Sequence, residues 1–281
     1  NWSNGFLPSV YQSVAFNSQG TPIPDLFPPK GMAAGTDLSS RKLLAEMNQD
    51  DLTRYGTEDA LLARIRSHEL AARMQLTVPE VTGLGSETEA TREMYGLNNE
   101  PTADFGKNCL LSRRLLEKGV RFVQIISGGS FGSPRINWDG HENMVKNHNR
   151  EAMRIDQPVA ALIKDLKQRS MLEDTLILFT TEFGRTPYTQ AGDGELGTGR
   201  DHNMYGFSVF MTGAGLKPGM TFGETDELGW KSVQDQVHWY DFHATVLHLL
   251  GMDHERLTFY HNGIERRLTN VHGNVVKGVL A

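Results

Sequence analysis

Two stretches of the chain carry the residue types that bind metal ions. The first, "WDGHEN", contains an Asp-x-His pair, and the second, from "TTEFGRTP" to "GRDHN", contains two acids and a histidine. Carboxylate oxygens and imidazole nitrogens together are the ligands of zinc, manganese or iron in hydrolytic sites, where the metal polarises an ester and lowers the pKa of bound water. We therefore predict a divalent metal, zinc first, with manganese or calcium as alternatives. The candidate ligands are Asp139, His141, Glu182, Asp201 and His202.

The second stretch also carries two arginines that could bind an anionic substrate. Arg185 and Arg200 each offer a planar guanidinium that can pair with two oxygens of a phosphate or sulfate group. Glu182 is the most informative acid, because a carboxylate that ends the apolar run "LILFTT" loses hydration unless a metal, an arginine or water compensates. Arg185 could be that structural partner of Glu182, so both interpretations of the arginine stay open.

A purely structural interpretation competes with the metal site. A single Asp-x-His pair is a weak signal, and Asp139 or Asp201 could cap a helix or bridge an arginine. The hypothesis of a metal site therefore rests on both stretches meeting at one place. The histidines from His238 onward are predicted to pack or to lie on the surface, and Cys109 is predicted to be a small buried side chain.

The hydrophobic pattern predicts the elements that would position these residues. Strands rich in β-branched and aromatic residues are expected at 120–126, 175–181 and 206–213, and a long helix that ends near Gln168 separates the first two. A strand, a crossover helix and a strand form a βαβ unit, so these two strands are predicted to be parallel. Further helices are expected at 39–54, 58–76, 86–95, 104–118 and 240–251.

Parallel strands would bring the two metal-binding stretches together. Ligands bind outside the carboxyl ends of parallel strands, where the following loops converge. "WDGHEN" follows the predicted strand at 120–126, and the second stretch follows the predicted strand at 175–181. Both loops are longer than the roughly two to six residues usual for such connections, and long ordered loops tend to be functional. We therefore expect the two sets of ligands to face each other across one edge of a sheet.

The composition limits the partners and the domain count. The 281 residues have a formal charge of −6 and a pI of about 5.9, and the basic residues are scattered, so no nucleic-acid-binding surface is expected. No apolar run approaches the roughly 18 residues of a membrane span, and a single cysteine excludes an internal disulfide. The length suits one α/β domain over 1–281. We expect an irregular segment rich in Pro and Gly at 1–37, a helical part at 39–118 and an α/β core at 119–281.

Several motifs, in order along the chain, resemble one protein family. The motifs are "DFGKNCLLSRRLLEKGVRFVQI", "WDGHEN", "LILFTTEFGRTP", "GRDHN" and "HATVLHLLGMDHERLTF". They are similar to the large bacterial family called domain of unknown function DUF1501, from about Asn1 to Ala281. That family is more distantly similar to alkaline phosphatases and sulfatases, which hold one or two divalent metals. The resemblance implies an alkaline-phosphatase-like α/β fold, with a mixed, mostly parallel sheet flanked by helices.

The resemblance also implies roles for particular residues. Glu182 would replace the metal-binding aspartate of the superfamily. His202 would replace the histidine ligand that comes late in the superfamily's sequence. Asp139 and His141 would replace its middle aspartate and histidine. Phe183 stands where the superfamily has a second ligand, which argues against a full two-metal site. The first metal aspartate and the nucleophile have no counterpart, so the catalytic nucleophile is unassigned and the chain is expected to lack the amino-terminal part of the fold.

Three functions are compatible with these residues. The first is a metal-dependent hydrolase of phosphate or sulfate esters, whose substrate is a small anionic ester or a sulfated or phosphorylated glycan. The family commonly carries a twin-arginine leader, which implies export to the periplasm. The second is a non-catalytic exported protein that binds a glycan or a protein partner on the same scaffold. The third is a structural subunit whose first 37 residues clasp a neighbour.

Overall fold

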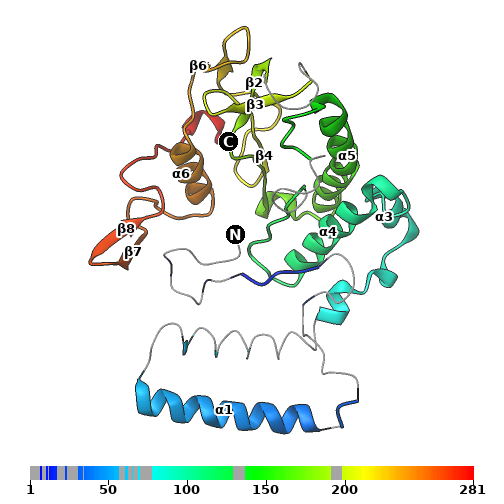
Figure 1. Ribbon diagram of the computed structural model, residues 1–281, viewed down its shortest axis with the longest axis vertical. Coiled ribbons are helices and arrows are strands. Elements are labelled where there is room, and N and C mark those ends of the chain that lie inside the picture. The colour runs from blue at the N-terminus through cyan, green and yellow to red at the C-terminus, as the bar shows by residue number, and fades with distance from the viewer. Residues whose placement is uncertain are drawn as a thin grey trace. The chain divides into compact units, whose positions relative to one another are not determined.

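The computed structural model divides the chain into two compact units. The first comprises residues 1–88 with 117–119, and the second comprises 89–116 with 120–281 (Figure 1). The structure describes residues 7, 11, 13–17, 23, 31–33, 35–56, 61, 62, 65, 69, 78–128, 137–190 and 198–281. Most of the predicted irregular segment at 1–37 and of the predicted helix at 58–76 lies outside these residues. The single domain over 1–281 stays a prediction.

Among the described residues of the first unit, the long helix α1 (Thr36–Tyr55) confirms the helix predicted at 39–54. Its periodic apolar residues do not form a buried face, since no residue of α1 is buried. A short 3₁₀ helix, η2 (Leu84–Ser86), also belongs to this unit. The described core of the unit is small, with Ile23 and Val78 buried and Phe16 packed against them.

Three helices of the second unit precede its first strand, and the last two of them carry most of the buried apolar side chains described in this unit. They are α3 (Glu89–Met94), α4 (Glu100–Glu117) and α5 (Met144–Gln168), and they confirm the helices predicted near 86–95, at 104–118 and up to Gln168. α4 begins earlier than predicted because Pro101 fits the first turn of a helix, where its missing N–H is not needed. One stripe of α5 is buried, with residues three or four apart: Asn147, Glu151, Ile155, Pro158, Leu162 and Leu166.

A buried ionic cluster connects α4 to α5. Arg113 Nε lies 3.0 Å from Asp165 Oδ2, and both side chains are almost fully buried. Asp165 also accepts hydrogen bonds from Arg169 Nε at 2.7 Å and from the Tyr95 hydroxyl at 3.0 Å. These donors offset the loss of hydration that a buried carboxylate suffers. Burial, together with the Asp165 charge, raises the pKa of Tyr95 far above its usual value.

The described strands of the second unit form four antiparallel pairs. β1 and β4 confirm the strands predicted at 175–181 and 206–213. The pairs are β1 (Leu176–Phe179) with β4 (Phe210–Gly213), β2 (Gly184–Thr189) with β3 (Arg200–Asn203), β5 (Glu224–Thr225) with β6 (Ser232–Gln234), and β7 (Thr258–His261) with β8 (Ile264–Arg267).

The prediction of a strand at 120–126 is wrong, because this segment belongs to no hydrogen-bonded strand. Phe122 is 76% exposed and Ile126 is 52% exposed. β-branched and aromatic residues favour a strand only where a neighbouring strand and a packed face exist. Without this strand, the predicted parallel βαβ unit is not formed by the described strands. The alkaline-phosphatase-like fold with a mostly parallel sheet therefore stays a prediction.

The helix α6 (Trp239–Leu249) confirms the helix predicted at 240–251. Its first residue, Trp239, contacts Glu182 in the segment that follows β1. A capping box begins the helix, in which His238 Nδ1 accepts from the backbone N–H of Tyr240 and the Asp241 carboxylate accepts from the backbone N–H of His238. Trp239 Nε1 donates to the carbonyl oxygen of Glu182 at 3.1 Å. The short 3₁₀ helices of this unit are η3 (Leu172–Asp174) and η4 (Lys277–Val279).

Candidate metal centre

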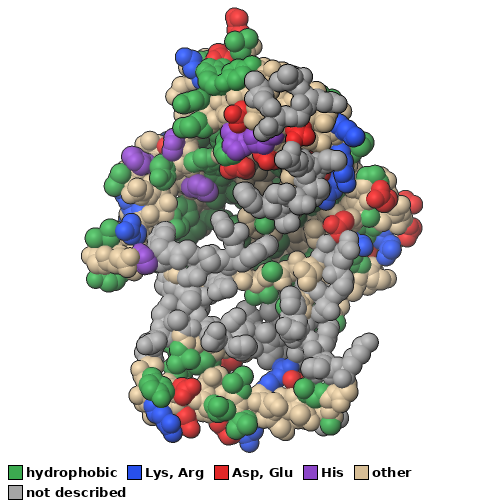
Figure 2. All heavy atoms as spheres, in the orientation of Figure 1, with side chains coloured by type: hydrophobic (Ala, Val, Ile, Leu, Met, Phe, Trp, Pro, Cys, Tyr) green, Lys and Arg blue, Asp and Glu red, His purple; other side chains and the backbone are tan. Residues whose placement is uncertain are grey.

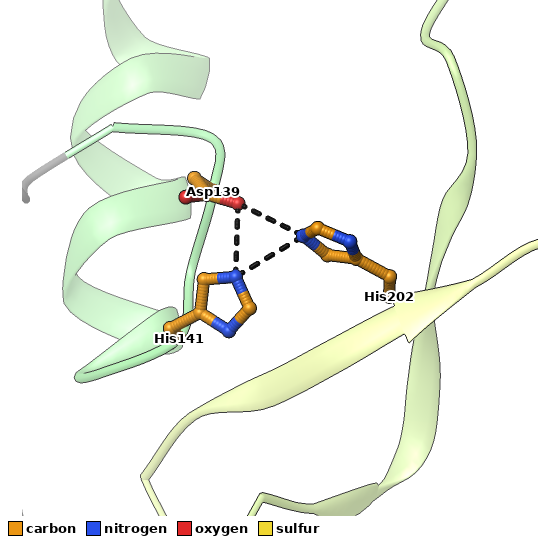
Figure 3. A group of neighbouring side chains, drawn as sticks. All are labelled: Asp139, His141 and His202. Carbon is orange, nitrogen blue, oxygen red and sulfur yellow. Dashed lines mark hydrogen bonds and ion pairs between the residues drawn. The ribbon is translucent and has the colours of Figure 1, made fainter. Parts of the chain in front are cut away.

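Three of the predicted metal ligands converge on one point. Asp139 Oδ1 lies 3.2 Å from His141 Nε2 and 3.4 Å from His202 Nε2, and the two imidazole nitrogens are 3.1 Å apart. Figure 3 shows these side chains pointing toward one another, Asp139 and His141 from the loop before α5 and His202 from β3. They form the only group of three or more candidate metal ligands among the described residues. We call this group the ligand triangle.

The dimensions of the ligand triangle suit a tetrahedral metal ion. For bonds of about 2.0 to 2.1 Å, two ligands of tetrahedral zinc lie about 3.3 to 3.4 Å apart. The three separations, 3.1, 3.2 and 3.4 Å, are close to this value. Three protein ligands with an open fourth position are typical of catalytic zinc sites. Two imidazoles favour zinc, manganese or iron over calcium, because calcium prefers about six to eight oxygen ligands.

Hydrogen bonds hold the loop that carries Asp139 and His141. The backbone N–H of Asp139 donates to Asn137 Oδ1 at 2.8 Å. On one side of this turn, Trp138 Nε1 donates to Ser127 Oγ at 3.0 Å, and on the other, His148 Nε2 of α5 lies 2.9 Å from the carbonyl oxygen of Trp138. The loop is therefore fixed to α5 and to the segment after 120–126.

Backbone contacts bring β3 against this loop. The N–H of Arg200 donates to the carbonyl oxygen of Gly140 at 3.0 Å, and the N–H of Met144 donates to the carbonyl oxygen of Thr198 at 2.9 Å. Gly199, between these two contacts, lies so close that a Cβ atom would overlap with the carbonyl oxygen of His141. A glycine is needed here because no side chain fits between the two segments.

The strand β2 and the residue that follows it orient the ligands. Arg185 is paired with His202 in the β2–β3 ladder, and Gln190 follows the end of β2. Gln190 Oε1 lies 2.6 Å from His141 Nδ1. Because an amide oxygen only accepts, Nδ1 carries the proton, and the Nε2 of a neutral ring then directs its lone pair into the triangle. A second hydrogen bond of this kind is the usual support of a metal-binding histidine.

Arg185 is the cation that contacts the ligand triangle. Its Nη2 donates to Asp139 Oδ1 at 2.5 Å, and its Nη1 lies 3.4 Å from His141 Nε2. Burial alone raises the pKa of the Asp139 carboxyl. The hydrogen bond and charge of Arg185 outweigh burial, with smaller contributions from His141 and His202, so this pKa lies below its usual value. Asp139 is therefore held as a carboxylate, the form that binds metals.

Phe183 packs against the site instead of contributing a ligand. Its ring lies 4.2 Å from that of His202, centroid to centroid, and the guanidinium carbon of Arg185 lies 6.0 Å from the ring centroid. The Phe183 ring thus limits the positions of His202 and Arg185.

Two of the predicted ligands lie outside the ligand triangle. The Glu182 carboxylate accepts from Thr181 Oγ1 at 3.3 Å, and the Asp201 carboxylate accepts from the backbone N–H of His202 at 2.7 Å. Arg200, predicted to bind substrate, donates from Nη1 to the carbonyl oxygen of Gly199 at 3.1 Å. The side chain of Asp201 lies outside the triangle although that of His202 belongs to it, because neighbouring residues of a strand point to opposite faces.

Sequence reasoning missed two residues that the site requires. Gln190 has no local signal, since a lone glutamine in a predicted loop is common. Gly199 precedes "RDHN" directly, and a glycine next to candidate ligands can indicate a close backbone approach. Only the fold shows that Gly199 lies against the backbone of His141.

The ligand triangle is open to solvent. The side chains of Asp139 and His202 are 57% and 48% exposed, whereas that of Arg185 is 15% exposed. Figure 2 shows histidine side chains next to acidic ones at the surface in the region of β3. A small molecule could therefore approach the open side of the triangle.

The chain belongs to the family described as "Protein of unknown function (DUF1501)", whose model matches residues 1–280. This match confirms the family resemblance deduced from the motifs. No curated protein and no solved structure matches the chain. The more distant similarity to alkaline phosphatases and sulfatases stays a prediction. In the part of the chain that the structure describes, no helix has the length and apolar character needed to cross a membrane.

Proposed function

We propose that this protein is a metal-dependent hydrolase of phosphate or sulfate esters, with Asp139, His141 and His202 as the ligands of a divalent cation. The observation that carries the proposal is the convergence of these three donor atoms at separations of 3.1 to 3.4 Å. Zinc is the first candidate because of the two imidazoles. When bound, such a cation polarises an ester and lowers the pKa of water.

The residues around the ligand triangle support this chemistry. Gln190 holds His141 in the tautomer that presents Nε2. Arg185 offers a planar pair of N–H groups suited to two oxygens of a phosphate or sulfate. The exposed side of the triangle leaves space for the ester, which could be a small molecule or the sulfated or phosphorylated end of a glycan. Export to the periplasm is part of the same proposal.

Elemental analysis of protein purified without chelators tests the metal site. We expect close to one zinc ion per chain in the unmodified protein and a loss of most of it in Asp139→Asn and His202→Asn. Asp201→Asn and Glu182→Gln are the matched controls, because these acids lie outside the ligand triangle. Retention of metal in Asp139→Asn, or its absence from the unmodified protein, would contradict the proposal.

A screen with aryl phosphates and aryl sulfates tests the reaction. We expect turnover that is lost with Asp139→Asn and restored to apoprotein by the metal. A second candidate function is a non-catalytic binding protein, and the Arg185–Asp139 ion pair favours it, because this pair neutralises the carboxylate without any metal. A well-folded, metal-free protein that is inert toward both classes of ester would favour that alternative and contradict the hydrolase.

A further inference from the structure

The guanidinium of Arg185 contacts two of the three atoms that would hold the metal. Nη2 donates to Asp139 Oδ1, and Nη1 lies 3.4 Å from His141 Nε2. The same Nη1 is 3.4 Å from the carbonyl oxygen of Arg200. Arg185 therefore lies at the edge of the ligand triangle, and its side chain is only 15% exposed.

These contacts cannot all persist once a cation is bound. His141 Nδ1 is engaged with Gln190 Oε1, so Nε2 has a single lone pair. This lone pair faces Arg185 Nη1 at 3.4 Å and His202 Nε2 at 3.1 Å, and it cannot accept from Arg185 while it binds a metal. With a metal bound, Asp139 Oδ1 would contact both the Arg185 guanidinium and the cation. These two positive groups repel each other at such a short distance. A divalent cation must therefore displace the guanidinium at least from His141.

We infer that Arg185 and the metal ion compete for the ligand triangle, and that the displaced guanidinium binds the anionic oxygens of the substrate. The inference rests on the metal site proposed above. It adds that metal and anion bind cooperatively, because the metal releases the group that the anion needs. In the absence of metal, Arg185 is engaged with Asp139, and the site binds anions weakly.

The surroundings of Arg185 keep the displaced guanidinium near the site. The residue lies in β2, opposite His202, so its backbone position is fixed by the ladder. The Phe183 ring lies 6.0 Å from the guanidinium carbon and provides an apolar and π-rich surface along which the group can move. An anion bound to the metal would then lie within reach of a fork of N–H groups.

Calorimetric titration of the metal-free protein with zinc tests the competition, with and without sodium sulfate at matched ionic strength. We expect Arg185→Gln to bind zinc at least about tenfold more tightly than the unmodified protein when sulfate is absent, a typical coupling between sites. Sulfate should tighten zinc binding to the unmodified protein by a similar factor, and by much less in Arg185→Gln. Lys146→Gln removes an exposed charge five residues from His141 and should change zinc affinity by less than about twofold.

Two results would overturn the competition. One is equal or weaker zinc binding by Arg185→Gln, and the other is an equal gain with Lys146→Gln, which would indicate a general charge effect. If the unmodified protein binds zinc, Asp139→Asn does not, and Arg185→Gln gives no gain, the metal site stands and the competition fails. If no variant binds zinc, both fail. Circular dichroism checks that each variant is folded.

Discussion

Arg185 and His202 are directly opposite each other in the antiparallel β2–β3 pair. Side chains of opposite residues lie on the same face of the pair, so the guanidinium and the imidazole both reach Asp139, at 2.5 Å and 3.4 Å. The register of this pair therefore decides which residues form the site. A shift of β3 by one residue would present Asp201 in place of His202, because strand side chains alternate between faces.

Replacing Gln190 with alanine should weaken zinc binding without unfolding the protein. The Gln190 amide accepts from His141 Nδ1 and fixes both the tautomer and the ring orientation. Loss of such a supporting hydrogen bond typically lowers metal affinity by about 10- to 100-fold. Calorimetric titration with zinc measures the effect, and Gln168→Ala at the exposed end of α5 is the control. Unchanged affinity in Gln190→Ala would show that His141 is oriented by other contacts.

Replacing Gly199 with alanine should destroy the metal site. The added methyl group would overlap with the carbonyl oxygen of His141, so β3 and the loop before α5 must move apart. We expect a destabilisation of about 1 to 3 kcal/mol and loss of zinc binding. Urea unfolding and elemental analysis measure the two effects. The control is Gly85→Ala, because no atom lies within 4 Å of the added Cβ at that position; full zinc content in Gly199→Ala would refute the predicted overlap.

Replacing Asp165 with asparagine should destabilise the second unit strongly. The change removes the carboxylate charge that lies 3.0 Å from the buried Arg113 Nε, and breaking a buried pair costs about 3 to 5 kcal/mol. Urea unfolding measures the loss. Asp37→Asn breaks the half-exposed ion pair with Arg41 in α1 and should cost less than about 1 kcal/mol. Similar losses in both variants would mean that the buried cluster contributes no more than a surface pair.

The stability of the second unit should fall in alkaline solution because of Tyr95. Burial and the Asp165 charge raise the pKa of its hydroxyl in the folded state, while in the unfolded chain it ionises near pH 10. Above about pH 10 the unfolded state releases this proton and the folded state retains it. The free energy of unfolding should therefore fall by about 1.4 kcal/mol per pH unit.

Comparison with Tyr95→Phe isolates this effect. The variant lacks the ionising group, so its stability should not show the additional fall above about pH 10. Urea unfolding of both proteins at about pH 9 and about pH 11 gives the difference. Parallel curves for the two proteins would show that Tyr95 ionises normally in the folded state.

The sequence alone identified the two stretches that meet at the site. Ligand types are a property of the residues themselves, so Asp139, His141 and His202 could be selected as metal-binding candidates from "WDGHEN" and "GRDHN". The helices α3, α4, α5 and α6 were also predictable, because apolar periodicity and helix-ending residues act over a few neighbours. Family membership followed from the order of motifs, and the family model confirms it.

The tertiary structure decided which candidates act together. Glu182 and Asp201 have the same chemistry as Asp139, yet the ladder of β2 with β3 and the contact of Gly199 with His141 leave both outside the ligand triangle. The segment at 120–126 has the composition of a strand but no partner strand. Strand pairing and the approach of distant loops depend on contacts between residues far apart in the chain, and local sequence does not encode these contacts residue by residue.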